Sequence, residues 1–104
     1  WFGMSSFQTH GYRLGMLFGL KPKQVMEGVR LYNTIITHDM WNSKRSRVSL
    51  MTDCMYLMGK KYETGITIEK AKALTREEFG VETQPRPNTW SELRHAILRH
   101  SESP

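Results

Sequence analysis

The stretch SRVSLMTDCMYLMGKK, residues 46–61, has the broadest apolar pattern in the chain. Val48, Met51, Met55 and Met58 recur at steps of three and four residues, which is the spacing of one face of an α-helix. The apolar side chains that flank this face are Leu50, Cys54 and Leu57. A helix with so wide an apolar face has to be covered on several sides, so we predict that it is the central helix of the fold.

Both ends of this central helix have recognisable signals. The candidate N-cap residues are Asn42, Ser43 and Ser46, whose side-chain oxygens can accept hydrogen bonds from free N–H groups of the first turn. Gly59, followed by Lys60 and Lys61, predicts the other end, since cations are favourable at a helix C-terminus.

The segment before it, from Pro22, also has a helical pattern. Pro22 suits the first turn, because its missing N–H group would have no intrahelical partner there. The apolar stripe that follows consists of Val25, Val29, Tyr32, Ile36 and Met40. The β-branched run 34–37 is also compatible with a strand, but the length of the stripe favours a helix.

Two further helices are predicted after residue 61. Thr67 is a favourable N-cap for a helix that reaches Phe79, and Gly80 is placed for a left-handed C-terminal residue. A loop with two prolines follows over residues 81–88. The run Thr89-Trp90-Ser91-Glu92 is a capping box that predicts the start of the last helix.

For residues 1–21 the sequence is compatible with either a helix or irregular structure. Phe7, His10 and Leu14 recur at helical spacing, but the glycines at positions 11, 15 and 19 each cost about 1 kcal/mol in a helix relative to alanine. If the segment is helical, this small-residue stripe would allow a neighbouring part of the chain to approach closely. The short apolar run and its charges argue against membrane insertion.

These patterns predict an all-α fold, a compact orthogonal bundle of four to five helices with negligible sheet. A chain of 104 residues suits one domain over 1–104, with a polar tail at 101–104. Because the first residue is Trp, we expect a fragment or a processed product of a larger protein. A single cysteine excludes a disulfide framework and a Cys-rich zinc site, and favours a reducing intracellular compartment such as the cytoplasm or nucleus.

The net charge of +5 is unevenly distributed along the chain. Residues 1–62 have nine basic and three acidic side chains, whereas residues 63–104 have six basic and seven acidic ones. Such a one-sided positive field favours polyanionic partners, although a charge of this size is also ordinary for a soluble domain.

One candidate site lies at the predicted start of the central helix. Lys44, Arg45 and Arg47 surround a helix N-terminus, where unpaired N–H groups and the helix dipole favour a phosphate, and Trp41 could offer a stacking face. A solvated basic loop between two helices is the alternative. In a helix-turn-helix arrangement, the helix from about Ser46 would be the recognition element.

A second group of cations is expected at the far end of the same helix. Lys60 and Lys61 lie roughly 20 Å from Arg47 at 1.5 Å per residue. If the two central helices are antiparallel, Lys21 and Lys23 at the start of the preceding helix join them.

We therefore predict a non-catalytic nucleic-acid-binding domain, DNA and RNA both remaining open. The alternative is a protein-interaction domain of a larger assembly, which would dock an acidic or amphipathic segment or a nucleocapsid-like ribonucleoprotein through these cations. In that alternative Met51, Met55 and Met58 would line a groove, whereas their spacing favours ordinary core. The histidines lack metal-ligand spacing, and we expect no metal, cofactor or catalytic residue.

Overall fold

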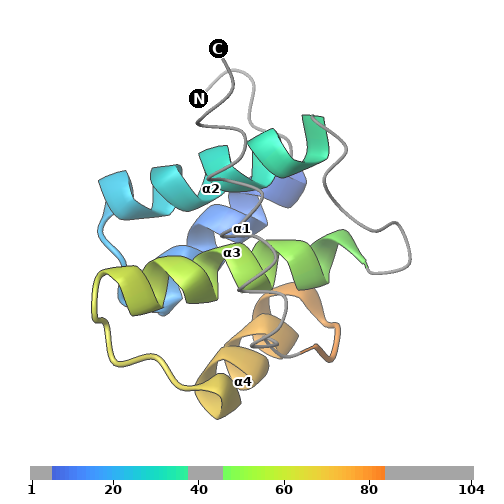
Figure 1. Ribbon diagram of the computed structural model, residues 1–104. Coiled ribbons are helices and arrows are strands. Elements are labelled where there is room, and N and C mark those ends of the chain that lie inside the picture. The colour runs from blue at the N-terminus through green and yellow to red at the C-terminus, as the bar shows by residue number, and fades with distance from the viewer. Residues whose placement is uncertain (1–5, 38–45, 84–104) are drawn as a thin grey trace.

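The computed structural model describes residues 6–37 and 46–83, and it folds them into four α-helices (Figure 1). These are α1 (Ser6–Leu17), α2 (Pro22–Thr37), α3 (Arg47–Lys61) and α4 (Ile68–Phe79). The described ranges contain no strand, so the predicted all-α bundle is confirmed. The helix predicted from Thr89 lies outside the described residues.

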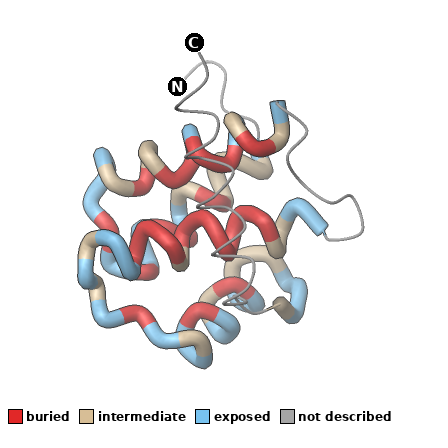
Figure 2. The backbone as a smooth tube through the Cα atoms, in the orientation of Figure 1, coloured by how far each residue is buried: buried red, intermediate tan, exposed pale blue. Residues whose placement is uncertain are grey.

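The prediction that the stretch 46–61 forms the central helix is also confirmed. α3 packs against α1, α2 and α4, and Figure 2 shows it buried along most of its length. α2 runs beside α3 in the opposite direction, α1 crosses behind both, and α4 lies below α3 in the view of Figure 1.

The local signals at the helix ends are found where the sequence places them. The Ser46 hydroxyl accepts a hydrogen bond from the Ser49 N–H group, and the Thr67 hydroxyl accepts one from Lys70 N–H. Gly80 adopts a left-handed conformation, with φ of 68°, and ends α4. These caps satisfy backbone groups that have no partner within the helices.

Gly11 and Gly15 of the glycine stripe lie in α1 and receive methionine side chains, whereas Gly19 follows the helix with φ of 94°. A Cβ atom at Gly11 would lie 2.6 Å from Cε of Met51, and one at Gly15 would lie 2.9 Å from Sδ of Met55. A Cβ atom at Gly28 of α2 would lie 2.9 Å from the same Met55 sulfur. Because glycine has no side chain, these positions of α1 and α2 leave space that the methionine side chains of α3 fill. The close packing offsets the low helix propensity of glycine.

The methionines of α3 are consequently core residues. Met51 and Met55 are fully buried and Met58 is 5% exposed. Cys54 lies in the same core. The interpretation of these side chains as core is confirmed, and the methionine-lined groove of the alternative hypothesis is not formed by them.

α4 is joined to the other helices through polar as well as apolar contacts. The buried Thr52 hydroxyl donates to the Val48 carbonyl and lies 3.3 Å from the hydroxyl of Thr75, which is fully buried on α4. The His10 imidazole of α1 lies 2.6 Å from the Glu78 carboxylate. The contact between α4 and its neighbours therefore depends on oriented donors and acceptors.

Candidate nucleic-acid interface

The structure separates the predicted site residues into two groups and leaves three undescribed. Trp41, Lys44 and Arg45 lie outside the described residues. Arg47 begins α3, whereas Lys60 and Lys61 end it. Lys21 directly precedes α2, and Lys23 lies in its first turn.

The predicted antiparallel placement of α2 and α3 brings four lysines to one end of the bundle. Lys61 Nζ lies 2.9 Å from Oε2 of Glu27, so the last turn of α3 is in contact with the second turn of α2. Lys23 precedes Glu27 by four residues and therefore shares its side of α2. We call the region around Lys21, Lys23, Lys60 and Lys61 the basic end.

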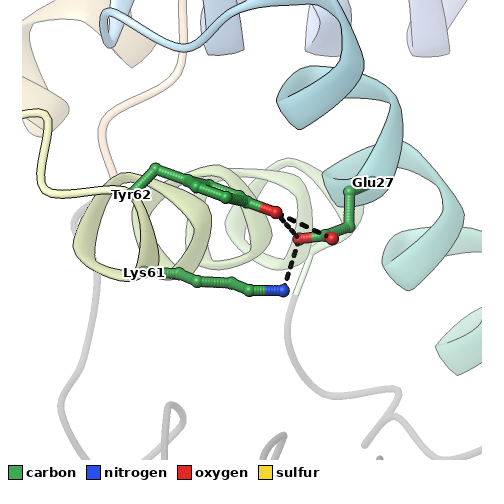
Figure 3. Close-up of polar contacts among 3 residues, drawn as sticks. All are labelled: Glu27, Lys61 and Tyr62. Carbon is green, nitrogen blue, oxygen red and sulfur yellow. Dashed lines mark hydrogen bonds and ion pairs between the residues drawn. The ribbon is translucent and has the colours of Figure 1, made fainter.

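The carboxylate of Glu27 holds the two helices together at this end (Figure 3). The Tyr62 hydroxyl lies 2.9 Å and 3.0 Å from the two carboxylate oxygens and donates to them, and Lys61 donates to Oε2. The hydrogen bond to Glu27 raises the pKa of Lys61, which remains charged. The charge of Lys61 is therefore partly neutralised by a structural contact.

The other three lysines of the basic end are exposed. Among the described residues, Lys21, Lys23 and Lys60 form no ion pair with a carboxylate. The Lys60 ammonium lies 5.2 Å from the centre of the Tyr56 ring, in a cation–π contact that leaves the charge unneutralised. These three side chains offer positive charge from two helices to a ligand in solution.

The opposite end of α3 is arranged differently. The N–H group of Ser49 is bonded to Ser46, and the Ser49 hydroxyl lies 2.7 Å from the hydroxyl of Thr83. Arg47 lies beside Tyr32: burial raises the pKa of the phenol, and the Arg47 charge and hydrogen bond oppose this increase. Part of the anion-binding capacity predicted for this helix start is thus used within the protein.

Most of α3 is buried, so only its two ends could reach a groove. In a helix-turn-helix, the N-terminal residues of the recognition helix contact the base edges. In α3 nine of the 15 residues are buried, and only Arg47, Lys60 and Lys61 are exposed. Arg47 is the one cation of the predicted helix start that lies in the described residues, and the helix-turn-helix arrangement stays a prediction.

Charge is concentrated on the first three helices. In the described part of the chain up to residue 61, seven basic side chains accompany two acidic ones, Glu27 and Asp53. Asp53 is only 4% exposed, so Glu27 is the acidic side chain that this surface presents. α4 has three basic and three acidic residues. The positive field therefore belongs to α1, α2 and α3.

Three further features of the described ranges concern metal ligands, the cysteine and membrane spans. Residues 6–37 and 46–83 contain no group of three or more His, Cys, Asp or Glu side chains that could hold a metal ion. Burial, together with the neighbouring Asp53 charge, raises the pKa of Cys54 well above its ordinary value. None of the four helices has the length and apolar character needed to cross a membrane.

Comparison of the chain with protein-family models, with curated proteins and with solved structures found no match.

Proposed function

We propose that this domain binds nucleic acid without catalysing a reaction, and that phosphates of the ligand contact Lys21, Lys23 and Lys60. The observation that carries the proposal is that these lysines extend from two helices at one end of the bundle and have no carboxylate partner among the described residues. Lysine neutralises backbone phosphates and releases their counterions, which supplies sequence-independent affinity.

An acidic protein segment is a less suitable ligand for this surface. A docked amphipathic helix needs an apolar groove to supply most of its affinity. The exposed large apolar side chains of the described residues are Met16, Leu17 and Val81, and the methionines of α3 are buried. Affinity at the basic end would therefore come from charge, which suits a regularly charged backbone.

The proposal is tested by titrating the protein into a fluorescent 12-nucleotide strand of thymidines, dT12, at 50 mM salt and measuring anisotropy. Replacing Lys21, Lys23 and Lys60 together by glutamine should weaken binding by about 100-fold, since each lost phosphate contact removes several-fold in affinity at this salt concentration. The matched control is K70Q/K72Q/R76Q, which removes three exposed cations from α4 and should bind like the unaltered protein.

Two results would contradict the proposal. Equal weakening by both triple variants would mean that net charge, and not the basic end, determines binding. Tighter binding to an acidic peptide of equal charge than to dT12 would assign the surface to a protein partner instead.

A further inference from the structure

We infer that the nucleic acid at the basic end is single-stranded and that one of its bases stacks on Tyr56. This inference rests on the proposed function and adds the class of nucleic acid to it. The observations that carry it are the contact between Lys60 and the Tyr56 ring, the positions of the lysines around α3, and the burial of α3.

The first argument concerns what the protein can offer to a duplex. Base pairs are read by an element that enters a groove. Lys60 belongs to α3, whose other side chains in its last three turns are buried or half-buried, apart from Lys61. Contacts of this end with a duplex would be confined to phosphates, whereas a single strand also presents its bases to the protein surface.

The second argument is the arrangement of Tyr56 and Lys60. They are four residues apart on α3 and share one side of the helix. Tyr56 is half-buried and packs against the core, so the ring is held in place. The ammonium group of the exposed Lys60, 5.2 Å from its centre, contacts one face of the ring. If Lys60 turns to a phosphate, a base can take its place, in a stacking contact that any base can make.

The third argument concerns the positions of the lysines around the end of α3. Lys61 faces α2 through Glu27, whereas Lys60 is rotated by about 100° around α3. Lys60 and Lys23 therefore extend from different sides of this end of the bundle. A single strand, which is much more flexible than a duplex with its persistence length of about 150 base pairs, can follow such an arrangement readily.

The first experiment uses the unaltered protein and three ligands: dT12, an abasic strand of the same length, and a 12-base-pair duplex. We expect dT12 to bind about tenfold more tightly than the abasic strand, and at least as tightly as the duplex, since one base stacked on an aromatic ring contributes about that factor. Equal binding of dT12 and the abasic strand would overturn the stacking contact, and tighter binding of the duplex would overturn the single-stranded ligand.

A second experiment assigns the contact to Tyr56. The Y56L variant should lose the tenfold preference for dT12 over the abasic strand, while Y56F, which keeps the ring, should retain it. Y12L is the control, because Tyr12 is also half-buried but lies on α1. A misfolded Y56L variant would lose binding of the abasic strand as well, so folding and stacking are distinguished. An unchanged preference in Y56L would contradict the inference.

Failure of this inference and failure of the proposed function give different results. If all three ligands bind equally and binding depends on Lys21, Lys23 and Lys60, only the inference is wrong. If binding does not depend on these lysines, the proposed function itself is wrong.

Discussion

α4 and the unit formed by α1, α2 and α3 differ in both packing and charge. In the three-helix unit, glycines of α1 and α2 receive the methionines of α3. Its described surface carries seven exposed basic side chains and one acidic one, the half-buried Glu27. α4 contacts this unit partly through the Thr52–Thr75 and His10–Glu78 pairs, and its own charges balance.

This difference separates two kinds of packing within one small domain. The stability of the three-helix unit depends on close apolar packing, which does not require particular donor and acceptor directions. The charges on its surface lie outside this packing. The contact with α4 depends on the orientation of hydroxyl and carboxylate groups, so single atoms matter more there. We expect ligand binding to belong to the three-helix unit, with α4 completing the core from outside.

The largest effect is expected from adding volume inside the three-helix unit. In Gly15→Val the new side chain would begin 2.9 Å from both Met55 and Val25, so both must move. We expect the free energy of unfolding to fall by about 3 kcal/mol, measured by urea denaturation. Ala73→Val, on the exposed side of α4, is the control and should cost less than about 1 kcal/mol. Similar losses in the two variants would contradict the distinction between the two regions.

Smaller losses of stability, which differ between the two partners of one hydrogen bond, are expected at the contact with α4. Thr52 donates its hydroxyl hydrogen to the Val48 carbonyl, so Thr75 is the donor in the Thr52–Thr75 pair. Thr52→Val leaves the buried Thr75 hydroxyl without this acceptor and should cost about 1–2 kcal/mol. Thr75→Val should cost about 0.5 kcal/mol, because Thr52 keeps its bond to the carbonyl.

The double variant T52V/T75V makes this prediction sharper. Replacing both partners by apolar groups of the same shape removes the unsatisfied hydroxyl, so the double variant should be more stable than T52V alone. Additive losses in chemical denaturation would instead mean that the two hydroxyls do not interact.

Glu27→Gln should alter stability and binding in opposite directions. Loss of the ion pair with Lys61 and of one acceptor oxygen for Tyr62 should lower the free energy of unfolding by about 0.5–1 kcal/mol, since the ion pair is partly exposed. Removal of the negative charge should strengthen binding of dT12 about twofold at low salt. Weaker binding by a folded E27Q variant would show that Glu27 contributes to the ligand site rather than opposing it.

The smallest effect is expected for Cys54 in the native protein. Burial keeps the thiol protonated and out of reach, and its pKa is raised well above the ordinary value. A chromogenic disulfide reagent at pH 8 should not react within minutes, but should react fully in 6 M guanidinium chloride. Rapid reaction without denaturant would mean that the three-helix unit opens readily, which its close packing does not allow.

Much of the fold could be predicted because its signals are local. The apolar stripe of residues 46–61, the caps at Ser46 and Thr67 and the left-handed Gly80 depend on neighbours a few residues away. The helical state of α1 was left open, because its glycines are unfavourable until Met51 and Met55 fill the space beside them. Long-range packing therefore overrides local propensity in that helix.

The candidate site could be predicted only in part. The antiparallel arrangement correctly placed Lys21 and Lys23 at the same end as Lys60 and Lys61. The role of Glu27 was not predicted, because its partners Lys61 and Tyr62 are 34 and 35 residues away and no spacing rule connects them. The contact between Tyr56 and Lys60, by contrast, has a local signal, because residues four apart on one helix are neighbours.

The most direct test of the binding proposal is the dependence of dT12 affinity on salt concentration. For single strands, each neutralised phosphate contributes about 0.7 to the slope of log affinity against log salt. We predict that the slope for K21Q/K23Q/K60Q is smaller than that of the unaltered protein by about 2, while K70Q/K72Q/R76Q keeps the original slope. Identical slopes for the unaltered protein and the basic-end variant would contradict the account.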